Sequence, residues 1–277
     1  MRSICCALTA IFAVAVSIPA AAAAKGPCVE VDEKVEALRV GDSFQANGAL
    51  IVAARLGCAD SVEKALKFGA NLEGQDRLGA TALARAAEAG KDAIVAILLA
   101  KGAKVNAPLA DGSTPLFLAA KASRAGAVKT LLDSGADPNI VGTSKLTPLA
   151  AAAYGGADAV VAALLDHGAK TDLVDATGKG PIIYAAARAS SSIVERLLKS
   201  GIAVNRLYEH KLSVLMWAAG YADGAGIEDV KATLTMLLKV GADAKAVDDR
   251  GLDAVAIARA LKHDEIADWL AAQTAGK

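Results

Sequence analysis

The chain has 277 residues, with 30 Lys and Arg against 30 Asp and Glu, so its formal net charge at pH 7 is zero. This balance excludes a field over the whole molecule that would attract nucleic acid or an anionic membrane, although a local patch is compatible with it. Apolar residues make up 54% of the chain and aromatic residues only 4%, a composition typical of thin helices that pack closely through alanine.

The first 24 residues are typical of a secretory signal peptide. Arg2 is followed by an apolar run of 15 residues, Ile4 to Ile18, which is short for a bilayer span. Ala22 and Ala24 then form the small-residue pattern of a cleavage site. We therefore expect residues 1–24 to be removed and the mature chain, with a net charge of about minus one, to be periplasmic or secreted. An uncleaved N-terminal anchor is the alternative.

The segment 25–42 is expected to form a short helix, because its apolar residues Val31, Val35 and Leu38 recur at helical spacing. Of the four cysteines, Cys28 in this segment and Cys58 beyond it would remain after cleavage. An even pair in an oxidising compartment most simply forms a disulfide. A redox-active or metal-binding pair is the alternative, but no CxxC motif or neighbouring His supports it.

From residue 43 onward the chain repeats itself. A glycine closes each unit, at Gly69, Gly102, Gly135, Gly168, Gly201 and Gly241, in four steps of 33 residues and one of 40. Acceptable N-cap residues recur in the same register, at Gly48, Thr81, Thr114, Thr147, Gly180, Ser213 and Asp253. Each unit therefore predicts two short helices, the second ending at a left-handed glycine. Helices of this length need neighbours to be stable.

The pattern is most complete in Asp111-Gly-Ser-Thr-Pro-Leu-Phe-Leu-Ala-Ala120 and Gly135-Ala-Asp137. It resembles the ankyrin repeat, which has the same period and a Thr-Pro-Leu-His pattern. The His is replaced in every unit, by Ile51, Ala84, Phe117, Ala150, Ile183, Met216 and Ala256. The resemblance implies an all-α solenoid of about seven helix-turn-helix units in a bacterial, exported protein. The expected units are 43–75, 76–108, 109–141, 142–174, 175–207, 208–247 and 248–270, with 25–42 as a capping segment and 271–277 as a flexible tail.

The sixth unit is longer than the others. Seven residues are added within the stretch Gly220 to Asp229, and its three glycines predict a flexible loop. Insertions of this kind are often placed on the binding face of a solenoid. Tolerated surface variation is an equally good explanation.

No catalytic motif accompanies the repeats. The three histidines, His167, His210 and His263, are not spaced as metal ligands, and no nucleophile elbow or phosphate-binding loop occurs. We therefore expect no catalysis, cofactor or metal. An enzyme acting on a small molecule would need a convergent pocket with perturbed ionisable groups.

The resemblance implies a binding site on the concave face of the solenoid, formed by turn tips and first helices, where the family generally binds proteins. The positions carried over are Phe44, Gln45, Arg55, Arg77, Leu78, Glu88, Asp111, Lys121, Tyr154, Lys179, Arg188, Glu209, His210, Tyr221 and Arg250. We expect Tyr154, Arg188 and Tyr221 at the centre, because Tyr and Arg carry much of the energy of protein interfaces. Trp217 is expected in the core.

These observations predict a monomeric, non-catalytic module of the periplasm that binds another protein, with no nucleic acid or membrane partner. The sequence does not identify that partner. Three roles remain open: an accessory or chaperone-like factor for a periplasmic enzyme, an immunity or inhibitor protein that neutralises a toxin, and an effector secreted to a host cell.

Overall fold

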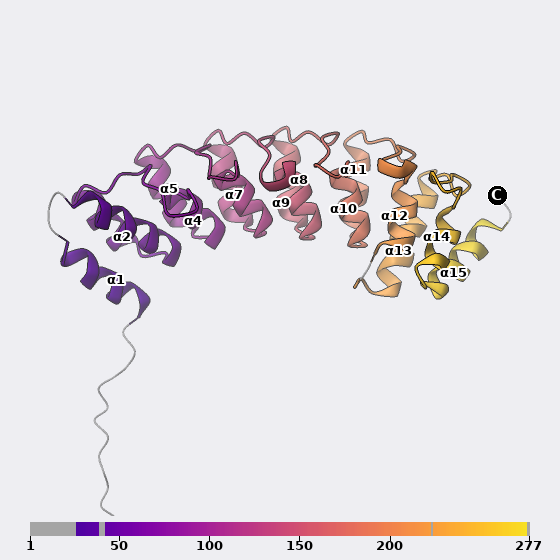
Figure 1. Cartoon of the computed structure of the whole chain (residues 1–277), viewed down its shortest axis with the longest axis horizontal. Helices are drawn as coiled ribbons and strands as arrows, with labels where there is room; N and C mark the ends of the chain where they lie inside the picture. The colour runs from indigo at the N-terminus through magenta and orange to yellow at the C-terminus, as the bar shows by residue number, and fades with distance from the viewer. Residues whose placement is uncertain (1–25, 39–41, 223, 276–277) are drawn as a thin grey trace, which may run out of the picture.

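The computed structural model describes residues 26–38, 42–222 and 224–275, in which helices stack in chain order into a curved array (Figure 1). The described residues contain 15 α-helices and no strand, apart from an isolated β-bridge between Gln75 and Thr81. The expected all-α solenoid is therefore confirmed. The predicted signal peptide, residues 1–24, lies outside the described residues.

Each unit contributes a first and a second helix. The first helices are α2 (Ser43–Leu56), α4 (Ala82–Ala89), α6 (Pro115–Lys121), α8 (Pro148–Tyr154), α10 (Pro181–Ala187), α12 (Val214–Gly220) and α14 (Ala254–Ala260). The second helices are α3 (Ala59–Lys67), α5 (Asp92–Ala100), α7 (Ala125–Asp133), α9 (Asp158–Asp166), α11 (Ser191–Lys199), α13 (Ile227–Lys239) and α15 (Asp264–Thr274). Each first helix contacts its own second helix and the first helices of the adjoining units. Buried alanines and leucines fill these contacts in one continuous core.

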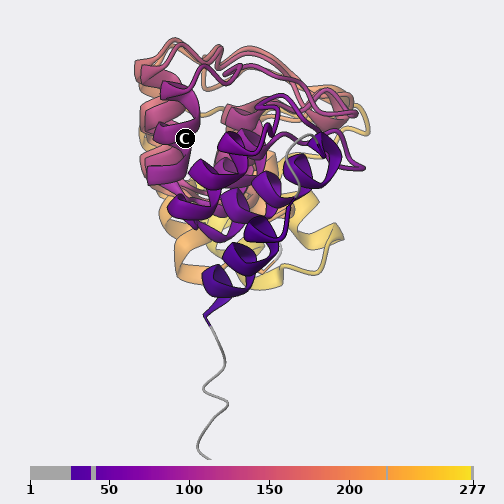
Figure 2. The same ribbon diagram turned by 90° about the vertical axis from the view of Figure 1, so that its left-hand side faces the viewer.

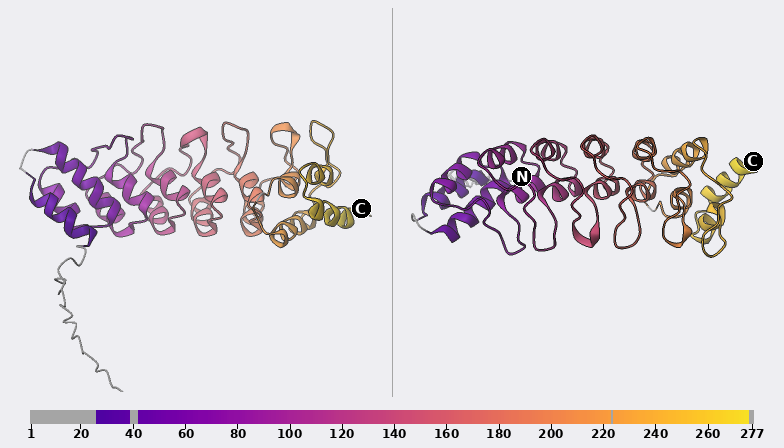
Figure 3. Two further views of the ribbon diagram at one scale, coloured as in Figure 1. Left: turned by 60° about the horizontal axis from the view of Figure 1, so that its bottom comes forward. Right: turned by 90° about the horizontal axis from the view of Figure 1, so that it is seen from above.

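The loops between the units project from one side of the array (Figure 3) and gather along one edge when it is viewed from its N-terminal end (Figure 2). Two of them contain short 3-10 turns, Thr143–Lys145 and Glu209–Lys211. The loops and the first helices that follow them therefore share one surface of the molecule.

Local hydrogen bonds explain where most of the helices begin and end. Five of the predicted N-caps accept a hydrogen bond from the backbone three residues later: Thr81, Thr114, Thr147, Ser213 and Asp253. Such a bond satisfies an N–H group that the first turn leaves unpaired. The glycines predicted to close the second helices all have positive φ angles, as a left-handed helix end requires.

The first unit differs from this pattern. Asp42 caps α2 by accepting a hydrogen bond from the backbone of Gln45, so the predicted N-cap Gly48 lies inside the helix and that prediction is wrong. Aspartate is a stronger N-cap than glycine, and it starts α2 several residues earlier than the register of the repeat predicts. As a result α2 has 14 residues, whereas the other first helices have 7 or 8.

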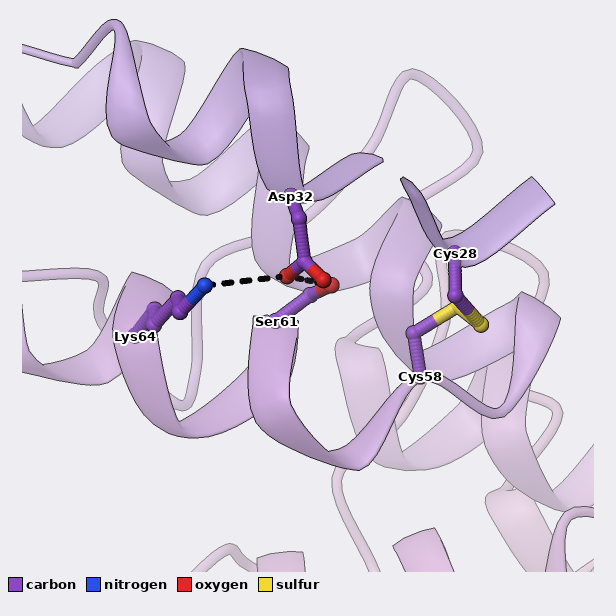
Figure 4. The surroundings of a disulfide bond; sticks show 5 residues. All are labelled: Cys28, Asp32, Cys58, Ser61 and Lys64. Carbon is purple, nitrogen blue, oxygen red and sulfur yellow. Dashed lines mark hydrogen bonds and ion pairs between the residues drawn. A yellow bond between two sulfur atoms is a disulfide. The ribbon is translucent and has the colours of Figure 1, made fainter. Parts of the chain in front are cut away.

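The N-terminal segment forms the predicted helix, α1 (Pro27–Glu36), which buries Val31 and Val35 against α2 and α3. Cys28 and Cys58 are joined by a disulfide with an S–S distance of 2.04 Å (Figure 4). Close to the disulfide, the Ser61 hydroxyl of α3 donates a hydrogen bond of 2.7 Å to the Asp32 carboxylate of α1. Covalent and polar links therefore hold α1 over the end of the array.

The sixth unit uses its additional residues partly as helix. Gly220 ends α12, and Ile227 to Asp229 form the first turn of α13. This second helix has 13 residues. The second helices of the preceding units, α3, α5, α7, α9 and α11, have 9 residues each. A Cβ atom on Gly220 would lie 2.4 Å from the Ile257 side chain, so the glycine permits close packing of α12 on α14. The prediction of a flexible loop over Gly220–Asp229 is therefore wrong for Gly220 and for residues 227–229, which are helical.

The C-terminal helix is also longer than expected. α15 continues to Thr274 and buries Ile266, Ala267 and Leu270. Residues 271–274, expected to belong to a flexible tail, are therefore helical. The apolar stripe before them packs on α13 and α14, and the helix continues past it for one more turn.

Aspartates hold the loops between the units in shape. One oxygen each of Asp76, Asp175 and Asp248 accepts hydrogen bonds from the backbone N–H groups two and four residues later. Burial tends to raise the pKa of these carboxyls, but the hydrogen bonds from side chains and backbone outweigh it and lower the pKa below its ordinary value.

The loops are therefore expected to weaken in acid. A carboxyl whose pKa is lower in the folded chain contributes stability that is complete above its unfolded pKa, about 4, and is lost as pH falls through the folded value. We expect the urea midpoint to stay nearly constant from about pH 7 to 5 and to fall below about pH 4. A D76N/D175N/D248N variant should be less stable than the wild type at neutral pH and should lose much of this acid dependence. An acid dependence equal to that of the wild type would contradict the assignment.

Candidate functional site

The first group of side chains on the loop and first-helix surface consists of Tyr154, Tyr184 and Arg188, which we call the tyrosine cluster. The rings of Tyr154 and Tyr184 meet edge to face, with centroids 5.9 Å apart and planes at 89°. The Arg188 guanidinium lies 5.7 Å from the centroid of the Tyr154 ring. Both contacts are favourable, because the ring face is negative and the ring edge and the guanidinium are positive. Tyr154 is nevertheless 57% exposed.

Asp175 supports this cluster from the loop before α10. The Tyr184 hydroxyl donates a short hydrogen bond to the Asp175 carboxylate, which also accepts bonds from its own loop. Burial and the neighbouring carboxylate raise the pKa of the Tyr184 phenol well above its ordinary value. Tyr184 therefore stays neutral and fixed, and it presents Tyr154 and Arg188 to solvent in a defined geometry.

The second group consists of Lys179, Trp217 and Tyr221, which we call the tryptophan cluster. The ring centroids of Trp217 and Tyr221 are 4.4 Å apart, and the Lys179 ammonium lies 5.2 Å from the centroid of the Trp217 ring. These residues line a cavity of about 220 Å³ together with Tyr208, Glu209, His210 and Leu212. The cluster therefore combines apolar ring surface with positive charge.

The position of Trp217 corrects the expectation that it belongs to the core. Its side chain is half-buried and packs against core residues, yet it also lines the cavity beneath Lys179. The indole Nε1 is buried and has no hydrogen-bond partner among the described residues. Trp217 lies one repeat period after Tyr184. Both aromatic residues therefore occupy the same register position in neighbouring units, and this recurrence is the sequence signal that indicates the two clusters.

The other site residues expected from the sequence have different surroundings. His210, at the tip of its loop, places its Nδ1 atom 2.8 Å from the Asp249 carboxylate of the next loop. Arg250 binds Asp248 at 2.7 Å, and this contact, with the nearby Tyr221 phenol, raises the pKa of the Arg250 guanidinium. Lys121 is exposed at the end of α6, and its side chain makes no hydrogen bond, ion pair or ring contact with a described residue.

Of the predicted site residues, Arg188 thus lies on Tyr154. Lys179 and Tyr221 both contact Trp217. Lys121 belongs to neither cluster. Among the described residues, no three His, Cys, Asp or Glu side chains are grouped as metal ligands would be. No helix of the described ranges has the length and apolar character needed to cross a membrane.

Sequence comparison identifies the repeats. A family profile described as ankyrin repeats (3 copies) matches residues 50–142 and 127–208, so its matches together span more than half of the chain. The chain belongs to the ankyrin-repeat family. No curated protein matches it at a significant level. Ankyrin repeats generally mediate protein–protein interactions and are typically not catalytic. In this ankyrin stack, the tyrosine cluster lies within the matched residues, and the tryptophan cluster extends beyond them.

Proposed function

We propose that this ankyrin stack is an exported, non-catalytic module that binds a partner protein through the tyrosine and tryptophan clusters. The observation that carries the proposal is the arrangement of four aromatic rings and two cations, Arg188 and Lys179, on adjacent loops and first helices. Aromatic and arginine side chains supply most of the energy of protein interfaces, because each buries a large area and keeps a polar group for hydrogen bonding.

Preorganisation supports the proposal further. Tyr154 and Tyr184 already pack on each other, and the hydrogen bond from Tyr184 to Asp175 limits their rotation. A partner therefore meets side chains that lose little conformational freedom on binding, which favours affinity. The cation–ring contacts also leave N–H donors of Arg188 and Lys179 available for carboxylates or carbonyls of the partner.

Export is part of the proposal and is supported by two features. Residues 1–24 have the composition of a cleavable signal peptide, and disulfides such as Cys28–Cys58 persist mainly in oxidising compartments. A bacterial periplasm meets both conditions. The intact mass of the exported chain tests this part, since cleavage after Ala24 would leave Lys25 as the first residue.

Replacing Tyr154, Arg188 and Tyr221 together by alanine is expected to weaken partner binding by at least about 2 kcal/mol, or roughly thirtyfold. The partner is first captured from a periplasmic extract with the mature chain as bait, and its affinity for the purified variants is then measured by calorimetry. Because Tyr154 and Arg188 are exposed and Tyr221 is only half-buried, the thermal midpoint should change little.

A control variant carries alanine at Lys67, Lys101 and Lys239, three exposed residues at the ends of second helices. It should bind the partner as the wild type does. If the two triple variants have equal affinities, the two clusters are not the binding site.

A further inference from the structure

The N-terminal end of the stack contains a groove that neither cluster uses. It has a volume of about 810 Å³ and lies between α2, the loop before α4 and α4 itself. Its α2 wall carries Phe44, Ile51, Val52 and Arg55, and its loop wall carries Arg77. The groove is larger than the cavity beside the tryptophan cluster, which has a volume of about 220 Å³.

The groove exists because the first unit lacks the long loop that precedes the other first helices. Only residues 37–42 separate α1 from α2, whereas residues 68–81 separate α3 from α4. The additional turns of α2 take the place of that loop, and the Asn47 side chain fastens them to the chain by accepting a 2.6 Å hydrogen bond from the backbone of Asn71. The face of α2 that looks toward the loop before α4 therefore stays open.

Apolar side chains lie on this open face. Phe44 is 87% exposed and Val52 is 38% exposed. Between them, a Cβ atom added to Gly48 would meet nothing within 4 Å. Positions 44, 48, 51, 52 and 55 fall on one side of a helix. Exposed large apolar residues gathered on one face mark interaction sites more often than scattered ones do.

The charges of the groove are not balanced. Arg85 binds Asp76 at 2.6 Å and Glu88 at 2.8 Å, so both carboxylates of the groove wall already have a cationic partner. The side chains of Arg55 and Arg77 are exposed and make no hydrogen bond or ion pair with a described residue. The groove therefore combines an apolar stripe with three guanidinium groups against two carboxylates, and the side chains of Arg55 and Arg77 are not paired with either carboxylate.

We propose that this groove binds a segment of a partner protein that carries a large apolar side chain next to a carboxylate. The apolar side chain would pack on Phe44 and Val52, and the carboxylate would accept paired hydrogen bonds from Arg55 or Arg77. From position 44 to position 55 the helix rises about 16 Å, which matches about five extended residues of a bound segment. Because the Phe44 side chain is 87% exposed, a small molecule bound inside the groove would not cover its ring. A peptide is large enough to fill the groove and cover the ring as well.

This site lies apart from the tyrosine and tryptophan clusters, so it is a second docking surface. A partner that engaged both would be held at two points, and its overall affinity would exceed that of either contact.

A library of random 12-residue peptides displayed on phage, selected on the mature chain, tests the proposal. We expect enrichment of sequences with an aromatic or aliphatic residue beside Asp or Glu. The most enriched peptide, synthesised with a fluorophore, should bind F44A and R55E/R77E at least about tenfold more weakly than the wild type by anisotropy. Because Arg55 and Arg77 act through charge, binding should also weaken as salt is added.

Two control variants should bind the peptide as the wild type does. K67E/K101E changes the charge by the same amount at the C-terminal ends of the second helices α3 and α5, and Y154A/R188A/Y221A removes the residues of the other surface. This second control separates the groove from the proposed function, since either site can fail without the other. Thermal melting of F44A should match the wild type, because the Phe44 ring is already exposed.

Three results would overturn the proposal. The first is that no sequence is enriched, or that the enriched peptides lack acidic residues. The second is equal affinity of the peptide for the wild type, F44A and R55E/R77E. The third is self-association in light scattering that F44A abolishes, because a second copy of the chain would then be the occupant of the groove.

Discussion

Replacing Phe117 by alanine is expected to destabilise the stack by about 3–5 kcal/mol. Phe117 is 1% exposed and is the largest of the fully buried side chains among the described residues. Its ring packs so closely on the following loop that a Cβ atom on Gly142 would lie 2.6 Å from it. Removing the ring would leave a cavity between the third and fourth units, and the chain on either side is held by its own hydrogen bonds and cannot collapse to fill it.

Urea unfolding followed by circular dichroism measures this loss, and hydrogen exchange locates it. Because each unit of a solenoid contacts only its neighbours, protection should fall most in α6, α7 and α8. Leu118→Ala is the matched control: it removes a half-buried side chain from the same helix and should cost clearly less. A Phe117→Ala variant within about 1 kcal/mol of the wild type would show that the site refills.

Removing the disulfide between Cys28 and Cys58 is expected to cost about 3 kcal/mol at the N-terminal end of the stack. The two cysteines are 30 residues apart in the sequence, and closing a loop of that size restricts the unfolded chain by about this amount in the chain-entropy model. The effect should be local, because within the described ranges α1 packs mainly on α2 and α3. We therefore expect α1 to detach before the remaining units unfold.

Hydrogen exchange of α1 in the oxidised wild type, the reduced wild type and C28S/C58S measures this effect. The last two should behave alike, and adding reductant to C28S/C58S should change nothing. Asp32→Ala is the control, since it removes the hydrogen bond from Ser61 but keeps the disulfide, and it should lower protection less. Equal protection of α1 with and without the disulfide would mean that the packing of Val31 and Val35 and the hydrogen bond from Ser61 to Asp32 hold the helix without it.

The repeat, the helical class and most helix ends can be predicted without the structure, because those features depend on residues close together in the chain. Thr114 caps α6 through the backbone only three residues away, and Gly135 ends its unit because it alone adopts the left-handed conformation there without strain. The pairing of Cys28 with Cys58 also followed from residue types, since only two cysteines follow the predicted cleavage site.

Which surface side chains meet depends on how the units pack in space. Lys179 lies on Trp217, and Arg188 lies on Tyr154, because neighbouring units stack at a particular distance and angle. The register of the repeat alone does not contain that geometry: it predicts a core position for Trp217, whereas the indole is half-buried and lines a cavity. The same holds for Gly48: the bond from the backbone of Asn71 to Asn47 joins two segments of the first unit that lie 24 residues apart in the sequence, and the cap at Asp42 starts α2 ahead of the predicted position. Contacts between units depend on how the whole array packs, and the groove and both clusters are products of that packing.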